Sequence, residues 1–203
     1  MGQLTGETTH IMGIAVPAEK SVERLVNRLA KVLAFFGGTV LTALAFMTVL
    51  STIGRAFVGM QIGLGPIPGD FELVEAGTAV AVFCFMSWCQ VNQGHVTVEI
   101  FTDRLGDSAN AWIVLLGNIL IFIVAFVVAW RLWMGFGEQV VWFSQPIRDM
   151  IGFGYKPFTN NTTYILGMPF WYSYLLSFIG ALCFCLISAF TVWRSLNDLL
   201  GRE

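Results

Sequence analysis

Three ionisable side chains lie beside long apolar segments, where charge is rare and usually functional: Arg55, Glu72 and Glu75. Arg55 ends one apolar segment, and the two glutamates begin the next, after a turn rich in glycine and proline. At a spacing of i and i+3, Glu72 and Glu75 share one helix face. They could act as coupling carboxylates that handle protons or cations, or form an Arg–Glu clasp between two helices. We favour the clasp, because coupling carboxylates usually lie near mid-membrane and these residues lie at the rim.

The common patterns of catalytic and cofactor-binding residues do not occur in the sequence. The two histidines, His10 and His95, cannot supply paired haem ligands within a helix bundle. P-loop, HExxH and GxSxG motifs are all missing. The cysteines form no CxxC pair and fall within apolar segments, where we expect small buried hydrophobic side chains: Cys84, Cys89, Cys183 and Cys185. The sequence therefore predicts neither an enzyme nor a metal or cofactor site.

The composition is that of an integral membrane protein. Hydrophobic residues make up 56% of the 203 residues and charged residues only 12%. A soluble domain of this size could not bury so much apolar surface in one core. The net charge of −2 gives no electrostatic basis for binding nucleic acid, and the apolar content excludes a disordered chain.

Four segments without charged residues are each long enough to cross a bilayer about 30 Å thick. Their apolar residues do not alternate with the period of two that a membrane β-barrel requires. We therefore predict an all-α membrane protein whose four transmembrane helices form one domain, residues 32–203. The predicted spans are about 32–54, 72–93, 109–131 and 166–193.

The N-terminal 31 residues divide into two parts. Residues 1–16 are predicted to be a cytoplasmic tail. In residues 17–31, apolar residues recur at helical spacing and basic residues occupy the other faces. This pattern predicts an interfacial amphipathic helix that leads into the first span. The alternative is a first span that simply starts early and has a solvated basic flank.

The distribution of basic residues predicts the orientation in the membrane. Four crossings put both termini and the 99–107 loop on one side, and that side has more basic residues: Lys20, Arg24, Arg28, Lys31, Arg104, Arg194 and Arg202, against Arg55, Arg131, Arg148 and Lys156. Because basic residues stay in the cytoplasm, both termini are predicted to be cytoplasmic. Residues 131–164 are then the largest extracytoplasmic feature, and their apolar patches predict a short interfacial helix.

Small and polar residues inside the spans predict contacts between helices. Gly77 and Ala81 form a small-xxx-small pair, and the Gly37–Gly38 pair offers another flat surface for close helix packing. Asn118 lies within the third span and could form a hydrogen bond with another helix.

The loop after the second span begins with Gly94, which could cap the helix and place His95 at the cytoplasmic interface. For His95 we favour capping or loop packing over a role as a pH sensor or ligand.

The stretches PGDFELVEAG and QVNQGHVTVEIFTDRL, in this order around an apolar span, resemble the small membrane subunit (DctQ type) of tripartite ATP-independent periplasmic (TRAP) transporters. A weaker match, TTYILGMPFWYSYLLSFIGAL, resembles the aromatic-rich start of that subunit's last helix, around Met168, Pro169 and Trp171. The residues that fit the family pattern around the second span are Glu72, Glu75, Gly94, His95, Val96, Val98 and Glu99.

The resemblance implies a subunit of a bacterial inner-membrane transporter that takes up organic acids with sodium. It implies two partners: a large multi-span membrane subunit, which holds the substrate and ion sites, and a periplasmic substrate-binding protein. This chain would then be a scaffold in the lipid bilayer. Two alternatives are a self-sufficient small transporter that uses Glu72 or Glu75 as its coupling carboxylate, and a membrane scaffold for an unrelated complex.

Overall fold

A computed structural model describes residues 16–58, 65–92, 107–157 and 161–200. The described residues form α1 (Val16–Phe57), α2 (Asp70–Val91), α4 (Asp107–Gln139), α5 (Gln145–Ile151) and α6 (Trp171–Leu200), and their only β-structure is an isolated bridge between Thr162 and Pro169. Four of these helices are long and apolar enough to cross a membrane, which confirms the predicted all-α fold with four spans.

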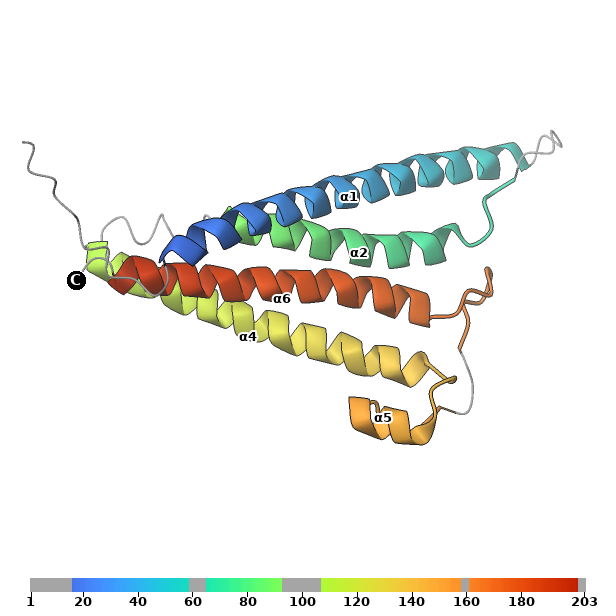
Figure 1. The fold of residues 1–203 in the computed structure, drawn as a ribbon. Helices are drawn as coiled ribbons and strands as arrows, with labels where there is room; N and C mark the ends of the chain where they lie inside the picture. Colours follow the sequence, from blue (N-terminus) through green and yellow to red (C-terminus); the bar gives the residue numbers. More distant parts are fainter. Residues whose placement is uncertain (1–15, 59–64, 93–106, 158–160, 201–203) are drawn as a thin grey trace, which may run out of the picture.

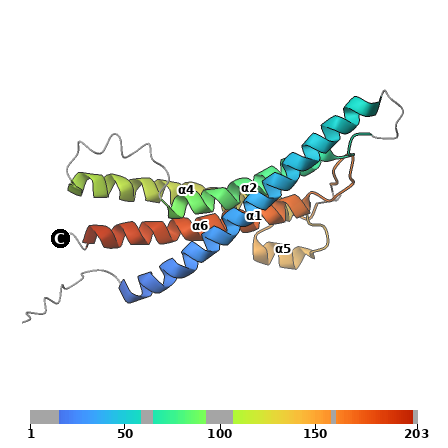
Figure 2. The same ribbon diagram turned by 90° about the horizontal axis from the view of Figure 1, so that it is seen from above.

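The long helices lie in the order α1, α2, α6, α4, so that α6 packs between α2 and α4 and α1 packs on α2 (Figure 1). They diverge toward the end where α5 lies, and α1 crosses the other helices obliquely (Figure 2). Consequently α6 supplies much of the buried core, including Phe184 and Ile187, whereas most large side chains of α1 are exposed.

Glycines allow close packing between α1 and α2 and between α2 and α6. A Cβ added at Gly37 would lie 2.9 Å from the Cβ of Cys84, and one added at Gly77 would lie 2.7 Å from the side chain of Leu44. A Cβ at Gly180 would meet Phe83 at 2.9 Å. The small residues at these positions therefore bring three helices together, as predicted for Gly77.

The structure has no separate helix over residues 17–31. These residues are the first turns of α1, which continues without a break into the predicted first span. The physical reason is that the junction, Leu29-Ala30-Lys31-Val32, consists of residues that favour or tolerate a helix and contains no glycine or proline. Whether these turns lie at the membrane surface remains a prediction.

The start of α1 and the end of α6 lie at the same end of the bundle, as four crossings require (Figure 1). There, the guanidinium of Arg194 lies 3.4 Å from the Glu23 carboxylate. At the opposite end, the short helix predicted within residues 131–164 is present as α5, between Pro146 at its first turn and Gly152 with φ of 82° after it. We call this the α5 end.

Candidate functional site

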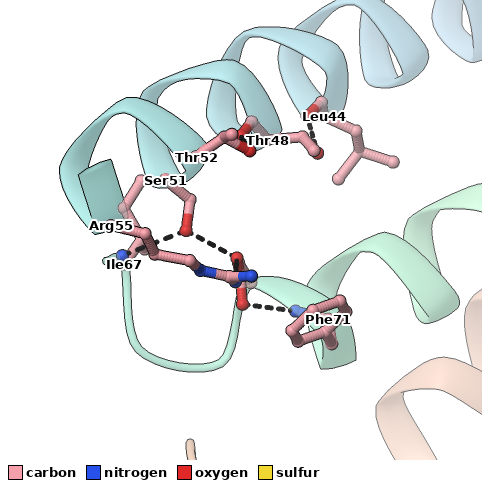
Figure 3. Close-up of polar contacts among 8 residues, drawn as sticks. Leu44, Thr48, Ser51, Thr52, Arg55, Ile67 and Phe71 are labelled. Carbon is pink, nitrogen blue, oxygen red and sulfur yellow. Dashed lines mark hydrogen bonds and ion pairs between the residues drawn. The ribbon is translucent and has the colours of Figure 1, made fainter. Parts of the chain in front are cut away.

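The polar residues at the α5 end join α1 to α2. The guanidinium of Arg55 donates to the carboxylate of Asp70, and the Ser51 hydroxyl donates to the same carboxylate at 2.5 Å. Ser51 and Arg55 project from the last turns of α1 toward the start of α2 (Figure 3). The Arg55 guanidinium also lies 4.8 Å from the centre of the Phe71 ring. Because Asp70 and Ser51 are buried, this pair is shielded on the carboxylate side. We refer to Ser51, Arg55 and Asp70 as the clasp.

The clasp was predicted, but its acidic residue was predicted wrongly. Arg55 pairs with Asp70, and neither Glu72 nor Glu75 is its partner in the structure. The reason is helical geometry: at 100° per residue, Asp70 and Glu72 point to opposite sides of α2. Since α2 begins at Asp70, two residues earlier than predicted, Asp70 is a helical residue that faces α1. The sequence contained a signal that α2 begins at Asp70, because an acidic residue is favourable in the first turn of a helix.

Glu72 binds a tight turn that precedes α6. Its two carboxylate oxygens accept hydrogen bonds from the backbone N–H groups of Ile165 and Leu166, at 2.8 and 3.0 Å. The turn is closed by backbone bonds between Thr163 and Met168 and between Asn161 and Phe170. Glu72 therefore links α2 to a segment more than 90 residues away, which we call the Glu72-bound turn (residues 161–170).

Glu75 lies one turn further along the same face, as the spacing predicted. Glu72 and Glu75 line one cleft of about 390 Å³, together with residues of α4, α6 and the Glu72-bound turn. The wall on α6 includes the buried Ser177. Among the described residues, no cluster of three or more His, Cys, Asp or Glu side chains could hold a metal ion. The cleft can therefore offer carboxylate oxygens to a cation only from these two glutamates.

A second polar network connects α2, α4 and α6 toward the other end of the bundle. The side-chain amide of Gln90 donates to Asn118 at 3.0 Å and to Thr191 at 2.8 Å, and the Asn118 amide donates to Ser195 at 2.7 Å. All four residues are buried. The predicted inter-helix hydrogen bond of Asn118 is therefore present, with Gln90 of α2 as a donor and Ser195 of α6 as an acceptor.

Arg148 is the most deeply buried charged side chain of the described residues, although its position in the sequence predicted only a loop charge. Its guanidinium donates to five backbone carbonyl oxygens, of Gly137, Val140, Phe153, Gly154 and Tyr155. Gly137 lies in the last turn of α4, whose final carbonyls have no partner within the helix. No sequence motif marks this role, because the acceptors are backbone atoms.

Two further expectations have mixed outcomes. Cys84 and Cys185 are buried as predicted, whereas Cys183 is half-buried and Cys89 is exposed, contrary to the prediction. Cys89 is exposed because, at 100° per residue, it points about 140° away from the buried Cys84 of the same helix. The loop residues Gly94, His95 and Glu99 lie outside the described residues, so their predicted roles stay predictions.

These features define a multi-pass membrane protein: four apolar helices whose polar side chains largely bind one another or the backbone. The family model for the DctQ component of tripartite ATP-independent periplasmic transporters matches residues 44–198. Because this match covers most of the chain, the protein belongs to the DctQ family, which is a family of transporter components rather than enzymes. No curated protein and no solved structure matches the chain.

Proposed function

We propose that this chain is the scaffold of a TRAP-type transporter that takes up organic acids with sodium. In this proposal the substrate and ion sites belong to a large multi-span membrane subunit, and a periplasmic binding protein delivers the substrate. The complex would lie in the bacterial inner membrane, with both termini of this chain in the cytoplasm. The support for this topology is the excess of basic residues on the side that holds the termini.

The scaffold role is supported by the polar side chains of the spans, which bind other groups of the same chain. A site that moves an ion or anion needs convergent polar groups or broken helices at mid-depth. In the described spans, Asn118 and Gln90 are bound to each other and to α6, and Asp70 is bound to α1. Both carboxylate oxygens of Glu72 already accept hydrogen bonds from the Glu72-bound turn. These groups stabilise the bundle and leave little polar capacity for a cargo.

The observation that carries the proposal is the uncovered face of α1. Gly37 packs against α2, but nothing lies within 4 Å of the position where Gly38 would carry a Cβ. Gly38 lies in an open groove of about 750 Å³, and the groove is lined by Lys31, Ala34, Phe35, Gly38, Thr39, Thr42, Ala43, Phe46 and Trp88. Small residues at Ala34, Gly38 and Thr42 recur at i, i+4 and i+8, a spacing that lets a second helix approach closely. We call this the α1 groove and assign it to a helix of the large membrane subunit.

The matched pair Gly38→Leu and Gly117→Leu tests this assignment. Gly117 lies in α4 and also has no atom within 4 Å of its added Cβ, but it lies outside the α1 groove. We expect Gly38→Leu to abolish co-purification with the large subunit from native membranes, and Gly117→Leu to leave it intact. Equal retention of the large subunit by both variants would overturn the assignment to the α1 groove.

Proteoliposomes test the scaffold role itself. We expect sodium-dependent uptake of organic acids only when this chain, the large subunit and the binding protein are all present. Uptake by this chain alone would contradict the scaffold and support the second candidate, a self-sufficient small transporter. The observation that favours this second candidate is the cleft lined by Glu72 and Glu75. In that case Glu75→Gln would abolish the uptake, whereas a scaffold would tolerate the same change.

A further inference from the structure

The segment after α4 folds back along α4 instead of leading away from it. In both views α5 runs beside the end of the bundle, along the direction of the long helices (Figures 1 and 2). The indole N–H of Trp133 lies 3.5 Å from the carbonyl oxygen of Ile151, at the end of α5. The rings of Trp133 and Phe153 are 4.5 Å apart, centre to centre. Trp133 precedes the end of α4 by six residues, which corresponds to about 9 Å at 1.5 Å per residue. The tip of this segment, Ile151 to Phe153, therefore lies about 9 Å back along α4.

We propose that residues 140–157 form a re-entrant segment, with its tip inserted among the lipids of the membrane leaflet at the α5 end. The occupant of its exposed face is the acyl-chain region just beneath the lipid headgroups. The exposed Trp130 and Trp142, which lie before and after the end of α4, indicate the depth, because tryptophans gather where headgroups meet acyl chains.

Most exposed side chains of α5 are apolar and fit a lipid environment. Met150, in its last turn, is 90% exposed, and Ile147 and Ile151 are also exposed. Asp149, which is exposed as well, accepts a hydrogen bond from the Gln145 side chain one turn earlier. Val127 and Trp130 of α4 are exposed as well. The buried side of the segment faces the protein instead, because Val140 and Phe153 pack with Phe136. Methionine and isoleucine exposed at this depth favour hydrocarbon over water.

Arg148 makes the re-entrant path possible. Irregular backbone is tolerated at membrane depth only where its polar groups are satisfied by the protein. The carbonyls of Phe153, Gly154 and Tyr155 belong to such irregular backbone, and all three accept hydrogen bonds from Arg148. Arginine suits this position because it offers five N–H donors in a fixed plane, whereas lysine offers three from a single nitrogen. Arg148 is therefore a positioning residue for the segment.

Depth-dependent fluorescence quenching tests the proposal. Cysteines are placed one at a time at Met150 and at Tyr164, which is 98% exposed at the same end, in the full chain without its native cysteines. Each is labelled with an environment-sensitive fluorophore and reconstituted in vesicles of phosphatidylethanolamine and phosphatidylglycerol. We expect shallow doxyl lipids to quench the label at 150 and aqueous iodide not to reach it, whereas iodide quenches the label at 164.

Two outcomes would overturn the proposal. Quenching of the label at 150 by iodide as strongly as at 164 would place α5 in water. Protection of the label at 150 from both quenchers would mean that another protein surface covers α5. This depth measurement uses the native Arg148, so it decides the question even if Arg148 variants do not fold.

The role of Arg148 is tested by Arg148→Met in the variant labelled at 150. We expect the label to gain iodide quenching and to lose doxyl quenching, and Arg148→Lys to give an intermediate result. The matched control is Arg131→Met, because Arg131 is an exposed arginine of α4 near the same membrane face. An unchanged quenching pattern in a folded Arg148→Met protein would remove Arg148 from the proposal.

Discussion

Arg55 and Asp70 are 15 residues apart in sequence, and their side chains form an ion pair that joins the last turns of α1 to the first residue of α2. The pair is asymmetric, since the Arg55 side chain is 43% exposed and the Asp70 side chain only 9%. Loss of the arginine would therefore leave a buried carboxylate with Ser51 as its remaining side-chain donor.

The clasp should show energetic coupling between Arg55 and Asp70 alone. We expect Arg55→Glu to destabilise the protein by about 1–3 kcal/mol, between the values for exposed and buried ion pairs. A second change, Asp70→Arg, should restore part of the loss, whereas Glu72→Arg or Glu75→Arg should not. Thermal unfolding in detergent for the double-mutant cycles measures this coupling. A rescue by Glu75→Arg equal to that by Asp70→Arg would contradict the observed pairing.

Glu72 should control the order of the Glu72-bound turn. Because Glu72→Ala removes the acceptor of both backbone N–H groups, it should speed amide exchange at Ile165 and Leu166 by about 10-fold or more. Glu75→Ala is the control, because Glu75 lines the same cleft without being an acceptor for these amides. Hydrogen–deuterium exchange measures the effect. Equal protection in wild type and Glu72→Ala would show that the turn holds itself closed.

The adjacent glycines 37 and 38 should respond in opposite ways to alanine. We expect Gly37→Ala to destabilise the protein by about 1–3 kcal/mol, because the new methyl group would clash with Cys84 across the α1–α2 interface. Gly38→Ala should be neutral or stabilising by up to about 1 kcal/mol, because alanine favours the helix and the space is open. Thermal unfolding of the isolated chain distinguishes the two. A destabilising Gly38→Ala would mean that the α1 groove is filled within the isolated protein.

The orientation in the membrane is testable with exposed positions at the two ends of the bundle. In a chain without native cysteines, Tyr164→Cys should react with a membrane-impermeant maleimide added to whole cells, and Asp198→Cys should react only after the membrane is opened. The expected result follows from the bias of basic residues toward the end that holds the termini. Labelling of Asp198→Cys alone in whole cells would reverse the orientation.

The class of fold and the number of spans could both be predicted from the amino-acid sequence alone. A bilayer imposes a minimum length and apolar content on each crossing, and both quantities can be read along the chain. The positions of Asn118, Gly77 and Ala81 were equally readable, since a polar or small residue inside an apolar helix indicates a contact with another helix. The family resemblance rested on local motifs around α2, and the match over residues 44–198 confirms it.

Which side chains contact each other could not be predicted in the same way, because it depends on how the helices pack. Asp70, Glu72 and Glu75 lie on one helix, but its register and its neighbours give them different contacts. Asp70 binds α1, Glu72 binds the Glu72-bound turn, and Glu75 lines the cleft beside Glu72. Arg148 looked like a solvated loop charge because its five acceptors are backbone carbonyls, which every residue carries and no sequence pattern marks. Side-chain types restrict the possible partners, and the path of the backbone in space selects among them.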